Sequence, residues 1–197
     1  DAPPQALVDR AASTFRRTDG DIREVVRTIV TSNEFYSRSA YRSKVKSPFE
    51  VVVSALRAIG AEPDTSPRTA RVIARIGQPI YGHQAPNGYP ETGGAWMNTG
   101  AILNRINFGI SVAAGRISGA RVEGIAGIGE LRSAPRERQV DAAAAMLLGG
   151  SISAEPRQIL MSGENPLLTS GSEPRPRLEG LAQVIGLALG SPEFQRR

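Results

Sequence analysis

The sequence predicts an all-α protein, an irregular bundle of about eight to ten short helices around one central helix. Apolar residues recur three and four positions apart through most of the chain, which is the spacing of one helix face. Serine, aspartate or asparagine precedes several of these segments and is placed to cap a helix start. Twenty-one glycines and 14 prolines interrupt the pattern, so each helix is expected to be short.

The first 32 residues predict a helical hairpin. After Pro3 and Pro4, apolar residues recur at helical spacing until the run 18–20, Thr-Asp-Gly, breaks the pattern. Asp21 is placed to cap a second helix, which carries its own apolar stripe and ends near Ser32. Two amphipathic helices joined by so tight a turn are expected to pack against each other as an antiparallel pair.

A short device occurs twice, each time after an apolar helix. It reads Ser-Asn-Glu-Phe at 32–35 and Ser-Pro-Glu-Phe at 191–194. A serine in this position can cap one further turn, and the phenylalanine can then insert as an anchor. No repeat of regular period links the two copies, so the sequence indicates a duplicated local device and argues against a solenoid.

The clearest helix start is the run 47–50, Ser-Pro-Phe-Glu. Serine at the cap, proline at the first helical position and glutamate at the third together satisfy exposed backbone amides. The valines at 51–53 also allow a strand, but the capping box and the stop at Gly60 favour a helix. Further helices are expected at 66–76, at 98–117, capped by Asn98 or Thr99 and central to the fold, and at 135–148, 156–161 and 178–189, with 118–134 weakly patterned and 165–177 a connector.

Composition limits the classes of protein to which the chain can belong. With 197 residues, 40% of them hydrophobic and 22% charged, one globular domain is expected over 1–197. The net charge of +5 comes from arginines spread over nearly every helix without a nucleic-acid-binding signature, which argues against a nucleic-acid partner. Cysteine is absent, and no metal or cofactor motif is found. No apolar run reaches membrane-spanning length, so any export signal is expected upstream.

The polar aromatic residues gather in the glycine- and proline-rich loop from Gly77 to Trp96. Because loops on rigid helices often carry binding groups, this loop is a candidate site for a small ligand or glycan, or an enzyme's site. The interpretation that the sequence favours is that the aromatic side chains form the internal core of the loop. His83 is the only histidine, and no nucleophile motif accompanies it, so no catalytic residue is assigned. The ligand-binding candidates are Tyr81, His83, Asn87, Tyr89, Glu91 and Trp96.

The densest basic run lies between the second and third expected helices. It comprises Arg38, Arg42, Lys44 and Lys46, interleaved with tyrosines. Such a run can bind phosphate, an acidic partner or an anionic polymer. The sequence favours the other interpretation, a solvated connector between two helices.

Several segments together resemble a bacterial family catalogued as domain of unknown function eighteen-hundred. The resemblance spans nearly the whole chain. It rests on KVKSPFE at 44–50, ALRAIG at 55–60, GQPIYG at 77–82, PNGYP at 86–90, GGAWMN at 93–98, LNRINF at 103–108 and GSPEF at 190–194.

The resemblance implies that the chain is the C-terminal part of a longer, exported protein, placed in the periplasm or outside the cell. The missing N-terminal half, or another protein subunit, is then the expected partner. The family has no established activity, so the resemblance supplies no catalytic residue. The leading hypothesis is a non-catalytic helical module with an interaction or assembly role. Ligand binding or catalysis at the loop, and binding of anionic polymers, are the alternatives.

Overall fold

The computed structural model describes residues 2–62, 65–125, 127–150, 152–164 and 178–197. These residues form nine α-helices and two short 3-10 helices. No strand occurs among them, although Val45 and Arg196 form an isolated antiparallel bridge. The predicted all-α class is confirmed. The expected connector at 165–177 lies outside the described residues.

The chain separates into two compact units, which are described in turn. The first comprises Asp1–Lys44 together with Arg197, and the second comprises Val45–Arg196.

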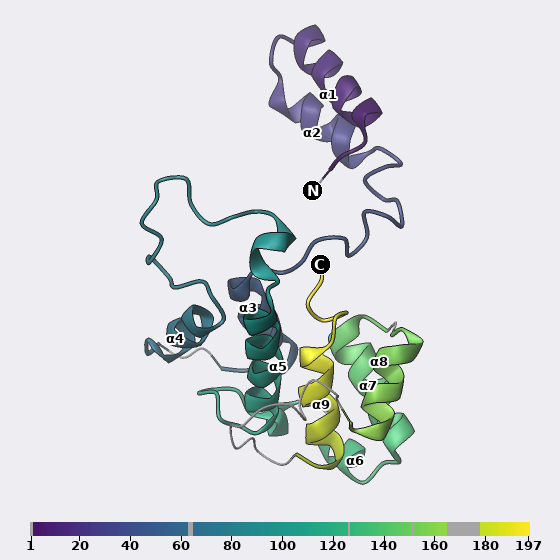
Figure 1. The fold of residues 1–197 in the computed structure, drawn as a ribbon. Helices are drawn as coiled ribbons and strands as arrows, with labels where there is room; N and C mark the ends of the chain where they lie inside the picture. Colours follow the sequence, from purple (N-terminus) through teal and green to yellow (C-terminus); the bar gives the residue numbers. More distant parts are fainter. Residues whose placement is uncertain (1, 63–64, 126, 151, 165–177) are drawn as a thin grey trace. The chain divides into compact units, whose positions relative to one another are not determined.

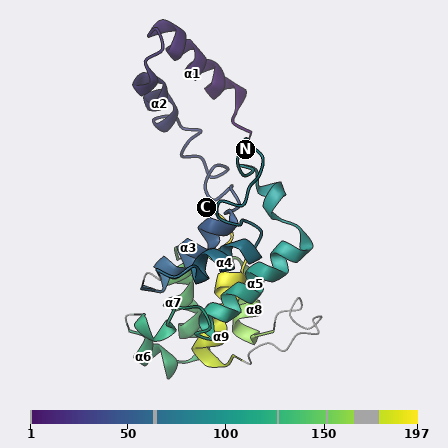
Figure 2. The same ribbon diagram turned by 90° about the vertical axis from the view of Figure 1, so that its left-hand side faces the viewer.

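The first unit is the predicted helical hairpin. Its helices, α1 (Gln5–Arg17) and α2 (Ile22–Val30), lie side by side in Figures 1 and 2. Asp21 caps α2, because its side chain accepts hydrogen bonds from two backbone amides of the first turn. The hydroxyls of Thr14 and Thr28, 3.2 Å apart, mark the line along which the two helices meet.

The second unit begins with the capping box that the sequence predicts. Ser47 Oγ accepts a hydrogen bond from the Glu50 amide at 3.3 Å, and the Glu50 carboxylate accepts one from the Ser47 amide at 2.8 Å. The helix that follows, α3 (Pro48–Ala58), buries Val51, Val52 and Ala55. Its early valines therefore stand in a helix, because both ends of the segment carry helix signals.

Two helices far apart in sequence form the centre of this unit. They are α5 (Thr99–Ala113), which Asn98 caps through the Ala101 amide, and α9 (Gly180–Gly190). A side chain at Gly109 of α5 would place its Cβ atom 2.7 Å from the Gly186 carbonyl oxygen, a separation that real Cβ atoms do not show. The two backbones can approach this closely only because both positions are glycine.

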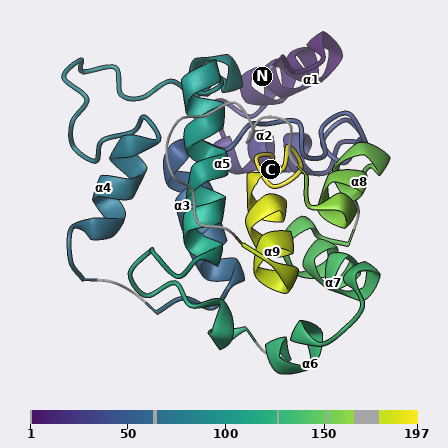
Figure 3. The ribbon, with the colours of Figure 1, turned by 60° about the horizontal axis from the view of Figure 1, so that its bottom comes forward.

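The remaining helices surround this pair. Figures 1 and 3 show α9 between α5 on one side and α7 and α8 on the other, with α4 on the side of α5 away from α9. Their side chains contribute to a single cluster of buried apolar residues. The bounds are α4 (Arg68–Arg75), η1 (Gly93–Trp96), η2 (Val122–Gly124), α6 (Ile128–Arg132), α7 (Arg136–Leu148) and α8 (Ala154–Ser162).

The structure differs from the expected elements at two places. The central helix was expected to reach Ile117, but α5 ends at Ala113, because Gly115 takes a left-handed φ of 67° and turns the chain. The helix α6 falls in the stretch 118–134, which the sequence marks only as weakly patterned. A five-residue helix is too short to show apolar periodicity.

Candidate functional site

The structure brings several of the predicted loop residues together. The rings of His83 and Tyr89 lie 4.6 Å apart, and those of Tyr89 and Trp96 lie 5.8 Å apart. His83 Nε2 is 3.2 Å from Asn87 Oδ1. The Tyr89 hydroxyl donates to the Pro79 carbonyl at 2.6 Å, so this side chain closes the loop on itself. His83, Tyr89 and Trp96 thus form a continuous row of tilted ring contacts, here called the aromatic stack, and Asn87 borders it at the exposed His83.

The other two loop candidates stand apart from this stack. Tyr81 is fully exposed and takes a positive φ of 59°, which is uncommon for a residue other than glycine. Glu91 is exposed as well. Trp96, by contrast, is buried and donates from Nε1 to the Pro90 carbonyl at 3.0 Å. The loop therefore pairs a packed interior with one tyrosine that stands in solvent.

The predicted basic run does not form one cluster within either unit. Arg38 and Arg42 lie in the first unit, where the Arg42 guanidinium stands 5.6 Å from the centre of the Tyr41 ring. Lys46 lies in the second unit, where its ammonium is 4.0 Å from the centre of the Phe194 ring and donates to Ser54 Oγ. Lys44, whose amide bonds the Arg197 carbonyl at 3.2 Å, is the last residue before the boundary between the units.

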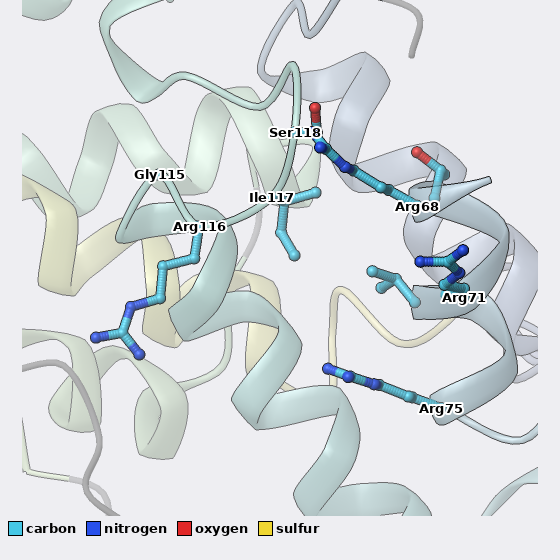
Figure 4. A pocket seen from close by; sticks show the side chains of 9 residues that line it. Arg68, Arg71, Arg75, Gly115, Arg116, Ile117 and Ser118 are labelled. Carbon is cyan, nitrogen blue, oxygen red and sulfur yellow. The ribbon is translucent and has the colours of Figure 1, made fainter. Parts of the chain in front are cut away.

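A pocket of about 420 Å³ opens between α4 and the segment that follows α5. Arginines make up much of its lining, so the pocket is positively charged. Figure 4 shows Arg68 and Arg75 reaching from α4 toward that segment, on either side of Ile117. In the same view, Arg116 lies on the opposite wall and its side chain runs away from α4. The lining residues are Arg68, Thr69, Arg71, Val72, Arg75, Gly115, Arg116, Ile117 and Ser118.

The arginines of α4 have opposing effects on the stability of their helix. Arg75 lies in the last turn, where the helix dipole favours a cation, but the spacing of the three arginines and the position of Arg68 are unfavourable. Arg68 and Arg71 are three residues apart, and Arg71 and Arg75 are four apart, so they are like-charged neighbours on one face. Each such pair costs about 0.2–0.5 kcal/mol. Arg68 also stands at the first helical position, where the positive end of the helix dipole disfavours a cation. This helix therefore carries a charge pattern that helix stability alone does not explain.

A second pocket in the same unit is mostly apolar and has a volume of about 480 Å³. It lies where the start of α5 meets α8 and the end of α9, and Glu155, Ser191 and Gln195 supply its polar groups. Its apolar lining residues are Met97, Ile102, Ile106, Pro156, Ile159, Leu160, Leu187 and Pro192.

Beside this pocket, Arg105 of α5 is a buried charge with a structural role. Its Nη1 donates to Gln195 Oε1 and its Nη2 to the Lys46 carbonyl, both at 2.9 Å. The side chain is 1% exposed, and Nε has no hydrogen-bond partner among the described residues. Burial lowers the pKa of Arg105 to about 10, because the charged form loses its hydration. The residue ties both ends of the second unit to its central helix.

The hairpin of the first unit presents an apolar face. Counting about 100° of rotation per residue from the threonine contact, Val8 and Phe15 stand about 100–120° around α1. Ile22 and Val26 stand about 120–160° around α2 by the same count. The helices are antiparallel, so rotation in the same sense brings both stripes to the same side of the pair. All four side chains are exposed, and Ile22 is 62% exposed.

The described residues contain no group of three or more His, Asp or Glu side chains arranged to hold a metal ion. No helix in the described part of the chain is long and apolar enough to cross a membrane.

A family model described as Protein of unknown function (DUF1800) matches residues 1–196. The chain belongs to this family. The match covers residues from both units, including the aromatic loop and the arginine pocket. No curated protein and no solved structure matches the chain.

Sequence reasoning missed two features of this DUF1800 chain, the arginine pocket and the buried Arg105. The arginines of α4 follow a spacing of three and four residues, which could have shown that they share one face. The wall formed by 115–118 comes from a segment about 40 residues later in the sequence, and no local pattern joins the two. The sequence does not indicate that Arg105 is buried, because a single arginine within an apolar helix can also extend its charged group to solvent.

Proposed function

We propose that this chain is a non-catalytic interaction module of an exported protein, and that the apolar face of α1 and α2 is its binding surface. The observation that carries the proposal is the exposure of Val8, Phe15, Ile22 and Val26 on one side of the hairpin. The second unit buries most of its large apolar side chains, although Phe49, Ile80, Tyr81, Met97 and Met161 are exposed there.

The energetics support a bound partner. Full burial of a valine, isoleucine or phenylalanine side chain is worth about 1.5–3 kcal/mol. Four such side chains on one face represent several kilocalories per mole that the hairpin alone does not recover. A two-helix layer has no third element with which to cover them.

The shape of the face fits a helical partner. Val8 and Phe15 are seven residues apart on α1, and Ile22 and Val26 are four apart on α2. These exposed apolar stripes form a face on which an amphipathic helix can pack its own apolar side. We propose that this helix belongs to an N-terminal part of the same polypeptide or to another protein subunit. Assembly, rather than chemistry, is then the role of the first unit.

The test is photo-crosslinking in the native host with a benzophenone amino acid at one of two positions. Phe15 lies on the apolar face, and Arg17, two residues later in α1, is exposed about 160° further round the helix. We expect crosslinks from position 15 to one defined polypeptide segment, absent from position 17. Equal crosslinking from both positions, or crosslinks from position 15 only to Val45–Arg196 of the same chain, would contradict the proposal.

A second candidate function is ligand binding at the loop from Gly77 to Trp96, and the conformation of Tyr81 favours it. A tyrosine held at positive φ costs about 1 kcal/mol or more, and such strain gathers at ligand-binding sites. Its exposed ring, which stands apart from the stack of His83, Tyr89 and Trp96, could pack on the face of a sugar ring.

Because Trp96 is the only tryptophan, its fluorescence reports on this loop. We expect titration with neutral oligosaccharides to change that fluorescence, and Tyr81→Ala to remove the change while leaving the spectrum of the free protein intact. An unchanged titration in the variant would exclude Tyr81 as a contact.

A further inference from the structure

The arginine pocket between α4 and 115–118 holds positive charge without any acidic residue in its lining. Four of its nine lining residues are arginines, and none of them pairs with a carboxylate among the described residues. We infer that this pocket binds a small organic molecule that carries two oxyanion groups, phosphate or carboxylate. The inference concerns the second unit and does not depend on the hairpin's apolar face.

The residue type points to oxyanions. The guanidinium is a planar fork of N–H donors that matches the two oxygens of a carboxylate or phosphate, and it keeps its charge at every physiological pH. The other arginines of the protein illustrate the contrast. Arg10, Arg27, Arg132 and Arg157 each pair with a carboxylate oxygen at 2.7 Å, whereas those of the pocket have no such partner in the described chain, a property that they share with exposed arginines such as Arg138.

The position of two arginines points to two separate anionic groups. Arg68 and Arg75 stand seven residues apart on α4, which places their Cα atoms about 10 Å apart along one face. Both side chains reach toward the opposite wall in Figure 4. In Figure 4 the two side chains run to either side of Ile117 rather than toward one point, so a ligand with an oxyanion at each end fits both forks as they stand.

The residues between the two arginines indicate which chemical groups the middle of the ligand would carry. Val72 of α4 and Ile117 of the opposite wall lie there and are partly buried against the core. They favour a short carbon chain or the face of a ring. The hydroxyls of Thr69 and Ser118 can bond neutral oxygens of the same molecule. Arg71 and Arg116 add positive potential, which raises the local concentration of anions.

The size of the pocket favours a small molecule over a polymer. A volume of about 420 Å³ is within the range of ligand pockets, which run from about 300 to 1,000 Å³. An anionic polymer would instead be expected to use arginines spread along an open surface. The ligand class is therefore an organic bisphosphate or a dicarboxylate of similar length.

The test is isothermal titration of the full chain with five probes at fixed ionic strength. Fructose 1,6-bisphosphate and suberate carry two oxyanions, glycerol 3-phosphate and inorganic phosphate carry one, and heparin represents a polymer. We expect at least one two-headed probe to bind about tenfold or more tightly than either one-headed probe. The preference between bisphosphate and suberate then identifies the oxyanion. If no two-headed probe binds more tightly than inorganic phosphate, the inference is wrong.

Three variants locate the binding. Arg68→Gln and Arg75→Gln should each weaken binding of the two-headed probe about tenfold or more, because each removes one charged fork. The matched control is Arg138→Gln, which removes an exposed arginine of α7 outside the pocket and should leave the affinity within about twofold. Both pocket variants remove like-charge repulsion in α4, so circular dichroism should show an intact fold.

Three outcomes of the two series would overturn the inference. The first is an affinity in Arg68→Gln and Arg75→Gln equal to that of the unmodified chain. The second is an equal loss in Arg138→Gln, and the third is tight binding of heparin alone, because either of these would mean attraction to the overall charge. Nitrogen-15 shifts of the Arg68 and Arg75 Nε–H groups on addition of the probe give a readout at the two residues themselves.

Discussion

The same four-residue device follows α2 in the first unit and α9 in the second, and its two copies differ in one respect. Ser32 Oγ accepts a hydrogen bond from the Phe35 amide at 3.2 Å, and Ser191 Oγ accepts one from the Phe194 amide at 3.3 Å. The backbone turn is thus the same in both. Yet Phe194 is 3% exposed, whereas Phe35 is 48% exposed.

The two glutamates of the device also act alike. Glu34 pairs with Arg10 of α1 at 2.7 Å, and Glu193 accepts a hydrogen bond from the Ser153 hydroxyl, just before α8, at 2.8 Å. Each copy therefore ties the end of its helix to a neighbouring helix. We conclude that the local sequence determines the turn. Whether the phenylalanine of the turn is buried as an anchor depends on the helices that surround it.

Replacing the phenylalanines is the change with the largest expected effect. Phe194→Ala should lower the free energy of unfolding of the second unit by about 3–5 kcal/mol, because it leaves a cavity in the core. Phe35→Ala should cost less than about 1 kcal/mol. Urea unfolding followed by Trp96 fluorescence measures the first effect, and hydrogen exchange of the α1 and α2 amides measures the second. Similar losses in the two units would mean that Phe35 is also an anchor.

Arg105 holds Gln195, the residue that follows the turn at 191–194, through a buried hydrogen bond. Among the described residues, we find no comparable interaction at the turn at 32–35. Arg105→Met removes the two charged hydrogen bonds that hold Gln195 and the Lys46 carbonyl, and it should cost about 3 kcal/mol. The same urea experiment measures it, with Arg138→Met as the exposed control. A variant as stable as the unmodified chain would show that the buried charge is not needed to hold the C-terminal turn.

Replacing the serine of either turn should lower the stability of its unit by a similar amount. Ser32→Ala and Ser191→Ala each remove one cap of the same geometry, so each should cost about 1 kcal/mol in its own unit. Hydrogen exchange of the amides at Phe35 and Phe194 reports each turn separately. A loss confined to Ser191→Ala would indicate that the first turn is held by other contacts.

The smallest expected effect is on the stability of the hairpin at low pH, through Glu34. The hydrogen bond from Arg10 holds the pKa of Glu34 below its usual value of 4.5. A lowered pKa in the folded state contributes stability that is complete above pH 4.5 and is lost as the pH falls through the folded pKa. Glu34→Gln should therefore remove a small part of the acid sensitivity of the hairpin. Carbon-13 titration of the Glu34 carboxyl checks the direction, and a value at or above 4.5 would contradict the pairing.

Much of the fold follows from signals that are local in sequence. Asp21, Ser47 and Asn98 cap the helices that the sequence assigns to them, and Gly149 ends α7 in a left-handed conformation. Each signal acts through hydrogen bonds or steric freedom within a few residues, so the sequence alone reveals it. The end of α5 was less predictable, because Gly109 and Gly115 look alike in sequence while one packs against α9 and the other turns the chain.

The sites were harder to predict than the fold. The loop residues were found as a group because they are close in sequence, and the structure packs His83, Tyr89 and Trp96 against one another. The arginine pocket joins α4 to a segment about 40 residues away, and the burial of Arg105 depends on both ends of its unit. Such features arise from tertiary packing, which periodicity and capping do not encode.

The close contact of α5 with α9 at Gly109 and Gly186 has a consequence for biosynthesis. These positions are separated by about half of the second unit, and α9 supplies the buried centre of the cluster. A ribosome delivers residues in order, so the core cannot close until α9 has emerged. Until then the apolar faces of α3, α5 and α7 stand open, and the nascent chain depends on rapid release or on a chaperone. A chain that stops before α9 would be a target for proteases rather than a smaller version of the domain.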